Sequence, residues 1–211
     1  MKHLILGGTG GTGRQLVEQA LAAGHDVTAL VRDPANAGLA HAKLALVKGR
    51  ATDADDVAAA VAGHDAVLSA LGPRKNKDPI SAEAAKATVE AMKRQGIKRL
   101  VWLSAGGVGD SAPQLVRASF VFGKIIMPLF LKHPYANHAI AEEVVRGSGL
   151  DYTIVRPVQL VDKQTAGTIT AVPIGDGKIG GLKISRHDVA AWMLGEVTAN
   201  KFVGAAPILH A

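Results

Sequence analysis

Short apolar runs and longer amphipathic stretches alternate along most of the chain. The amphipathic stretches repeat their apolar positions about every 3.6 residues, which is the period of a helix packed on one face. The apolar runs are short and rich in Val, Ile and Leu, which is typical of strands buried on both faces. We therefore expect strands at 4–6, 25–32, 43–48, 66–70, 99–103 and 152–157, and helices from Arg14 to about Gly24 and at 53–61, 79–95 and 138–149.

This alternation predicts an α/β fold, a doubly wound parallel sheet with helices on both faces and right-handed crossovers. Ligands of such sheets lie beyond the carboxyl ends of the strands. The chemistry of this chain should therefore be found in the residues that directly follow each strand.

The alternation breaks between 113 and 135. An apolar stretch, 116–131, has only a partial helical period, so it could roof a substrate crevice, cover a core or form a dimer interface. Further on, Ser185 and Asp188 have the spacing of a capping box ahead of a helix at 190–197. We expect one domain, 1–211, as a monomer or homodimer, in which a small C-terminal region, about 113–185, forms the substrate crevice.

A glycine-rich turn follows the first predicted strand. Such a turn folds back sharply and lets backbone N–H groups and a helix N-terminus face the phosphates of a dinucleotide. Two glycine frames fit this role, one starting at Gly7 and one at Gly8, and both continue through Gly10 and Gly13. We expect the whole turn to bind a cofactor pyrophosphate: Gly7, Gly8, Thr9, Gly10, Gly11, Thr12 and Gly13.

The end of the second strand selects between NAD and NADP. An acidic residue there binds the ribose 2′-hydroxyl, whereas an arginine accommodates a 2′-phosphate. Arg32 occupies this place, and Asp33 follows it, but Pro34 predicts a turn that directs Asp33 away. The residues thus favour NADP(H), with NAD(H) possible.

Other candidates follow later strands. Ala70, Leu71, Gly72 and Arg74 follow the fourth strand, and Arg74 could contact a phosphate or be an ordinary solvated charge. Ser104 follows the fifth strand, where its hydroxyl either donates to the nicotinamide amide or a substrate carbonyl or caps the turn. His138 either faces the crevice as a catalytic group or is a surface histidine.

Composition narrows the function classes. The net charge is +6 and the pI about 9.7, but the basic residues are dispersed and aromatics make up only 4%, so we expect no nucleic-acid partner. No apolar run reaches the ~20 residues of a membrane span, and no signal peptide is recognisable. The chain has no cysteine, and its eight histidines are scattered, so we expect no metal site and a cytoplasmic location.

Several motifs together resemble the atypical short-chain dehydrogenase/reductase superfamily. Within it, the chain resembles the NAD(P)H-binding group that includes biliverdin reductase B-like flavin reductases and NmrA-like proteins. The motifs are the glycine turn 7–13 and segments 27–32 (VTALVR), 62–67 (AGHDAV), 71–72 (LG), 148–157 (SGLDYTIVRP) and 184–190 (ISRHDVA).

The resemblance implies a Rossmann-like fold with a small C-terminal substrate region and NADPH as the more common cofactor. It places Gly7, Gly10 and Gly13 in the preferred frame and Arg32 on the 2′-phosphate. It places Leu71, Gly72 and Arg74 along the cofactor and His138 near its nicotinamide end. We also expect Ser104 and Pro157, at the ends of their strands, to contact the cofactor.

The chain also departs from this group. The superfamily's Tyr-x-x-x-Lys pair is missing, because Pro134 and His138 take the two places and Tyr135 is one residue out of step. Ala105 stands where a second hydroxyl residue is common. Gln159, our candidate substrate contact, replaces a second active-site histidine, and Arg50 replaces an Asp. We expect an NADPH-dependent reductase that transfers hydride to a small flavin, quinone or similar conjugated acceptor. The alternative is a non-catalytic NmrA-like redox sensor.

Overall fold

The computed structural model describes residues 1–211 except 73–77, 120–131, 164–167 and 176–177. Its main sheet has the strand order β3-β2-β1-β4-β5-β6-β10-β8. All neighbouring strands are parallel except β10 and β8. The strands are β1 (Lys2–Leu6), β2 (Asp26–Val31), β3 (Leu44–Lys48), β4 (Ala66–Ser69), β5 (Arg99–Leu103), β6 (Asp151–Pro157), β8 (Thr170–Val172) and β10 (Ile208–His210).

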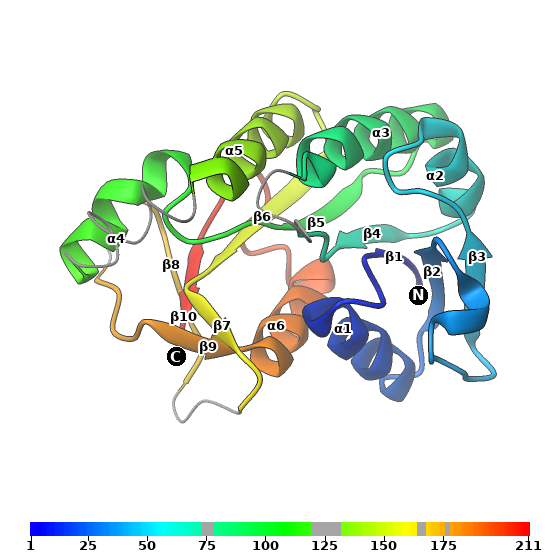
Figure 1. The fold of residues 1–211 in the computed structure, drawn as a ribbon, viewed down its shortest axis with the longest axis horizontal. Helices are drawn as coiled ribbons and strands as arrows, with labels where there is room; N and C mark the ends of the chain where they lie inside the picture. The colour runs from blue at the N-terminus through cyan, green and yellow to red at the C-terminus, as the bar shows by residue number, and fades with distance from the viewer. Residues whose placement is uncertain (73–77, 120–131, 164–167, 176–177) are drawn as a thin grey trace.

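Helices cover both faces of this sheet (Figure 1). One layer contains α2 (Ala54–Val61), α3 (Ile80–Gln95) and α5 (Lys132–Arg146), and the opposite layer contains α1 (Gly11–Ala22) and α6 (Arg186–Ala199). Each layer packs on its own apolar cluster, so both faces of the central strands are buried from solvent. This confirms the predicted Rossmann-like, doubly wound fold.

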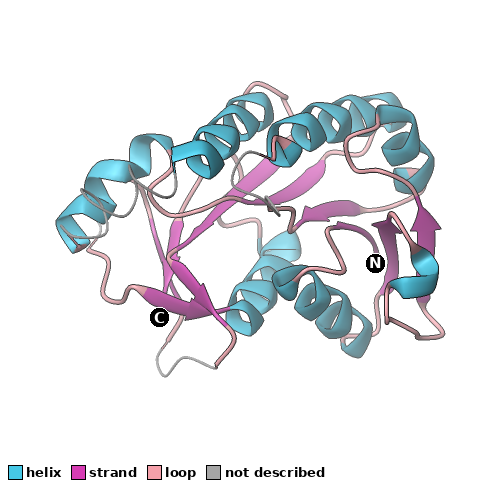
Figure 2. Cartoon of the chain, viewed as in Figure 1, coloured by secondary structure: helices cyan, strands magenta, loops and turns pink. Residues whose placement is uncertain are grey.

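The C-terminal part adds strands that the sequence pattern did not reveal. Strand β7 (Gln159–Val161) pairs in parallel with β9 (Lys183–Ser185) in a separate two-stranded sheet, visible beside α6 in Figure 2. Strand β10 adds to the main sheet beside β6. Each of these strands is only three residues long, so none carries enough alternation to be recognised in isolation.

Some predicted helix boundaries were wrong. Helix α1 starts at Gly11, three residues before Arg14, because the glycine turn itself forms the first helical turn. Helix α5 runs from Lys132 to Arg146 rather than from 138 to 149, and the left-handed Gly149 lies beyond its end. Helix α6 also begins earlier than 190, with Ser185 accepting a hydrogen bond from the Asp188 backbone N–H, as the capping spacing predicts.

Candidate cofactor and acceptor site

The glycine turn connects β1 to α1 and is sterically closed to larger residues. Gly7 has a φ of +81°, and a Cβ on it would lie 2.9 Å from the Ala70 carbonyl oxygen. A Cβ on Gly13 would lie 2.0 Å from the Gly7 carbonyl oxygen, and the Gly10 N–H donates to that same oxygen at 2.9 Å. The geometry thus supports the frame of Gly7, Gly10 and Gly13.

The other members of the turn have different surroundings. Gly8 is buried, and a Cβ there would lie 3.2 Å from a Val17 methyl group. Gly11 lies under the Arg186 side chain, whose Cδ would be 2.7 Å from an added Cβ. Thr12 is buried in the first turn of α1, whereas Thr9 is exposed at the tip. Arg186 is an additional neighbour of the turn that sequence reasoning missed.

A small cavity of about 150 Å³ lies beside this turn. It brings together segments from the ends of β1, β2, β3 and β4, as a shared carboxyl edge requires. Arg32 lines it and is exposed, whereas the Asp33 carboxylate accepts a hydrogen bond from the Asn36 side chain at 2.7 Å. The predicted residues among its lining are Gly7, Thr9, Gly10, Arg32, Ala70, Leu71 and Gly72.

These residues fit a dinucleotide. Side chains added to the glycines of the turn would fill the space beside its backbone, and the exposed Arg32 places a cation on the same cavity. Arg74 and the apolar stretch 120–131 lie outside the described residues.

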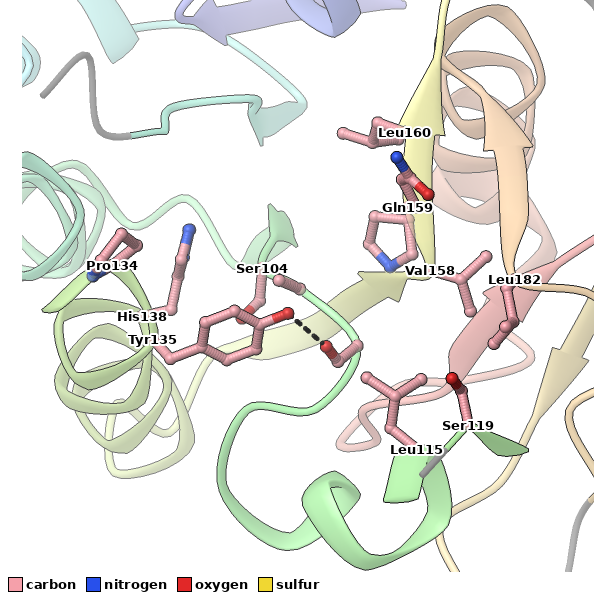
Figure 3. Close-up of a pocket in the computed structure, with 13 residues that line it drawn as sticks. Ser104, Leu115, Ser119, Pro134, Tyr135, His138, Val158, Gln159, Leu160 and Leu182 are labelled. Carbon is pink, nitrogen blue, oxygen red and sulfur yellow. Dashed lines mark hydrogen bonds between the residues drawn. The ribbon is translucent and has the colours of Figure 1, made fainter. Parts of the chain in front are cut away.

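A larger cavity of about 560 Å³ opens further along the same edge of the sheet (Figure 3). Ser104 and Pro157 reach it from the ends of β5 and β6, His138 from α5 and Gln159 from β7. The described residues that line it are uncharged or apolar: Ser104, Ala105, Gly106, Leu115, Ser119, Pro134, Tyr135, His138, Pro157, Val158, Gln159, Leu160 and Leu182. The four candidates predicted for the nicotinamide end therefore share one cavity.

Ser104 belongs to a buried polar chain beneath this cavity. Its hydroxyl donates to Glu142 Oε1 at 2.6 Å, and Glu142 also accepts from Arg156 Nε at 2.9 Å and from Arg156 Nη2. Arg156 in turn forms an ion pair with Asp110 at 2.5 Å. Glu142 and Arg156 are 3% and 1% exposed, so neither charge reaches solvent by itself.

Tyr135 and His138 face the cavity from the same side of α5. The Tyr135 hydroxyl donates to the Gly106 carbonyl at 2.9 Å, the dashed contact of Figure 3. The neighbouring Asn137 accepts from two backbone N–H groups at the start of α3, Ser81 at 2.9 Å and Ala82 at 3.2 Å, which anchors α5. Both lining side chains are therefore held on a fixed helix.

Burial controls the protonation of this pair. It raises the pKa of Tyr135 to about 12 and lowers the pKa of His138 to about 4. His138 is 7% exposed, and its Nδ1 has no hydrogen-bond partner among the described residues. At neutral pH the cavity thus contains a neutral phenol and a neutral imidazole.

Sequence reasoning missed Tyr135, Glu142 and Arg156 as parts of this site. One signal was present, because Arg156 is a charged residue inside an otherwise apolar strand and requires a buried partner. Glu142 lies one helical turn after His138, but its pairing with Ser104 and Arg156 depends on the docking of α5, which no local pattern encodes.

A second buried histidine lies in β1. His3 in β1 is 1% exposed, neither ring nitrogen has a partner among the described residues, and its pKa is lowered to about 4, first by burial and then by the nearby His25. His3 and His138 regain an ordinary pKa near 6.5 on unfolding.

We expect unfolding in urea to become easier as the pH falls from 6.5 to 4. In that window the unfolded chain takes up protons that the folded chain does not, so each imidazole removes at most about 3 kcal/mol of the stability present above pH 6.5. The variant His3→Leu should flatten part of this slope, and the exposed His187→Gln should leave it unchanged. An identical pH slope in His3→Leu would contradict the assignment.

Among the described residues, no group of three or more His, Cys, Asp and Glu side chains is arranged to hold a metal ion. Within the same residues, no helix has both the length and the apolar character needed to cross a membrane.

Two curated plant proteins are similar to this chain. An uncharacterized chloroplastic protein of Arabidopsis thaliana is 30% identical over 184 residues, which are 82% of this chain and 64% of the plant protein. The isoflavone reductase homolog IRL of Zea mays is 28% identical, over 90% of this chain and 62% of its own length. The chain therefore spans less than two thirds of each of these relatives.

Solved structures share the fold over nearly the whole chain. ChuY of Escherichia coli, described as an anaerobillin reductase, is 26% identical with a TM-score of 0.76, covering 99% of this chain and 96% of ChuY. A short-chain dehydrogenase/reductase of Veillonella parvula in complex with NADP has a TM-score of 0.83, covering 100% and 94%; at 18% identity it supports the fold alone. A family model described as NAD(P)H-binding matches residues 7–200, from the glycine turn through α6. The chain belongs to this NAD(P)H-binding family of the atypical short-chain dehydrogenase/reductase type.

Proposed function

We propose that the protein is an NADPH-dependent reductase that transfers hydride to a flavin, a quinone or a similar conjugated acceptor. The observation that carries this proposal is the cavity of about 560 Å³, which has an uncharged lining among the described residues and opens at the same sheet edge as the glycine turn. A cavity of this size suits a flat ring system of two or three fused rings. The reductase name of ChuY adds support by similarity.

The nicotinamide cofactor, when bound, supplies the hydride. The residues of the chain then have to position the acceptor and keep water from the reacting faces. Leu115, Val158 and Leu182 supply apolar contact area, while Ser104 and His138 orient polar edges. No charged acid is required beside the acceptor, because solvent can supply the proton to a reduced conjugated ring.

A panel assay tests this function. NADPH oxidation is followed at 340 nm with riboflavin, FMN, menadione and other conjugated acceptors, using protein whose NADPH binding has been verified by fluorescence titration. Steady turnover with at least one acceptor class is expected. Cofactor binding without turnover on any acceptor would reject the reductase proposal.

The alternative, a redox sensor that binds NADP(H) without catalysis, is favoured by one specific observation. The Ser104 hydroxyl gives its hydrogen to Glu142, and Pro134 occupies the place of the superfamily's catalytic tyrosine, so the superfamily's usual proton donors are missing. A protein partner whose affinity differs between NADP⁺ and NADPH, combined with no turnover, would support this alternative.

Arg32→Ala should weaken NADPH binding by about 10- to 100-fold and NADH binding by less than about threefold. The reason is the loss of a charge-assisted contact to the 2′-phosphate, which NADH lacks. Titration of intrinsic or cofactor fluorescence measures both dissociation constants. The exposed Lys98, at the amino end of β5, gives a matched control: Lys98→Ala removes the same charge and should change neither constant. Equal weakening of both cofactors by Arg32→Ala would remove Arg32 from the 2′-phosphate site.

His138→Ala should lower kcat by about tenfold or more while leaving the Kd for NADPH nearly unchanged. The imidazole lines the acceptor cavity and stays neutral, so its loss affects acceptor orientation rather than cofactor charge recognition. The matched control is His133→Ala, an exposed histidine on the same helix. Unchanged turnover in the His138 variant would exclude this residue from the reaction.

A further inference from the structure

The hydroxyl groups of Ser104 and Tyr135 each donate their single hydrogen to an acceptor within the protein. Ser104 donates to Glu142 Oε1 at 2.6 Å, and Tyr135 donates to the Gly106 carbonyl oxygen at 2.9 Å. Each hydroxyl has one hydrogen and two lone pairs. Toward a molecule in the cavity, these two hydroxyl groups can therefore act only as hydrogen-bond acceptors.

The receiving groups keep both hydroxyls in this orientation. The Gly106 carbonyl can only accept, and the Glu142 carboxylate faces the Arg156 guanidinium, whose Nε donates to the same Oε1 at 2.9 Å. Rotating the Tyr135 hydroxyl away would take this donor from the buried Gly106 carbonyl, and rotating the Ser104 hydroxyl away would take one of the donors from the buried Glu142 carboxylate, and both losses cost free energy. The polarity of the cavity wall is thus set by contacts behind it.

The other polar side chains of the described lining, His138, Gln159 and Ser119, can donate as well as accept, so the acceptor-only character belongs to Ser104 and Tyr135. A neutral His138 carries one donor and one acceptor, and the exposed Gln159 amide carries both kinds of group. Figure 3 shows Ser104, Tyr135 and His138 grouped on one side of the cavity, with Gln159 across from them on β7.

We propose that this wall selects conjugated acceptors that present a ring N–H, as in a lactam or imide, over acceptors whose edge carries only carbonyl oxygens, such as quinones. A ring N–H donates to the lone pairs of Ser104 and Tyr135, whereas a carbonyl edge would face them with lone pairs of its own. This inference rests on the proposed reductase function. It narrows the acceptors from flavins, quinones and similar conjugated rings to those that carry a ring N–H.

Two small molecules of nearly the same shape test the preference for a ring N–H by binding alone, without requiring turnover. Isoquinolin-1(2H)-one is a fused-ring lactam with an N–H, and isocoumarin replaces this N–H by oxygen. Binding of each to the protein saturated with NADP⁺ is measured by calorimetry or by competition. The lactam should bind about tenfold more tightly, because its N–H can donate to Ser104 and Tyr135, whereas the lactone oxygen faces the lone pairs of these two hydroxyls.

Variants locate the source of this preference. Ser104→Ala and Tyr135→Phe should each reduce the lactam preference, and the double variant should bring it to within about twofold of unity. Tyr152→Phe is the matched control, because this tyrosine donates to the Gly204 carbonyl at 3.0 Å away from the cavity. Thermal unfolding of each variant verifies that the fold is intact.

Failure of the inference and failure of the function are distinguishable. Equal binding of the two probes, or no binding of the lactam, overturns the inference even if acceptors are reduced in the panel assay. A clear lactam preference that disappears in the double variant supports the inference. Lack of turnover in that case would reject only the reductase function.

Discussion

Gly13→Ala should strongly weaken cofactor binding and destabilise the fold. The new Cβ would lie 2.0 Å from the Gly7 carbonyl oxygen, a backbone atom that has no rotamer in which to move away. Relief requires a backbone shift that separates α1 from the turn, so we expect a loss of at least about 3 kcal/mol of stability. We also expect a loss of about 100-fold or more in NADPH affinity, since the phosphate cradle moves with it.

Gly195→Ala is a control with the opposite expected sign. Gly195 lies within α6, and a Cβ there meets nothing within 4 Å, so alanine should stabilise the helix by about 0.5–1 kcal/mol. Urea denaturation gives both free energies of unfolding. A Gly13→Ala protein with wild-type stability and NADPH affinity would mean that the turn is not packed as described.

Glu142→Ala should cost about 3–5 kcal/mol of folding stability. The substitution leaves the Arg156 guanidinium, which is 1% exposed, with Asp110 as its remaining carboxylate partner, and removes the acceptor of the Ser104 hydroxyl. Chemical denaturation measures the loss, and the transition midpoint should fall without a change in its slope.

A double variant distinguishes the cost of removing the whole Glu142–Arg156 ion pair from the cost of leaving Arg156 buried without Glu142. Glu142→Leu with Arg156→Met removes both buried charges and should recover most of the loss, because well-packed apolar residues can replace a buried ion pair. The exposed pair of Arg94 and Asp55 provides the comparison: Asp55→Ala should cost less than about 1 kcal/mol. A Glu142→Ala cost as small as that of Asp55→Ala would show that the buried pair contributes little.

The sequence predicts the first half of the fold well because its signals there are local. Buried parallel strands are continuous apolar runs, and β5 falls at the predicted residues, 99–103. The glycine turn is equally local, since its constraints arise within seven neighbouring residues and Ala70. The end of α3 at Gly96, which has a φ of +69°, follows the same logic.

The C-terminal part and the far wall of the acceptor cavity follow from long-range packing instead. Strands β7 and β10 are short and exist because partners distant in the sequence, β9 and β6, are already in place. Tyr135 lies one residue after the place of the tyrosine in the Tyr-x-x-x-Lys pair. Its position on α5 nevertheless brings its hydroxyl to Gly106. The chemical character of Ser104 depended on Glu142, 38 residues away.

The parallel pairing of β7 with β9 has a consequence for how acceptor specificity could be redesigned. It fixes Leu160 opposite Ile184, so that β7 and β9 form one small unit although they are distant in the sequence. Leu160 in β7 and Leu182, directly before β9, line the acceptor cavity, whereas the glycine turn and Arg32 come from the first 32 residues. Gln159, Leu160 and Leu182 can therefore be varied together. Libraries confined to these three positions would vary one wall of the acceptor cavity while the cofactor half is inherited unchanged.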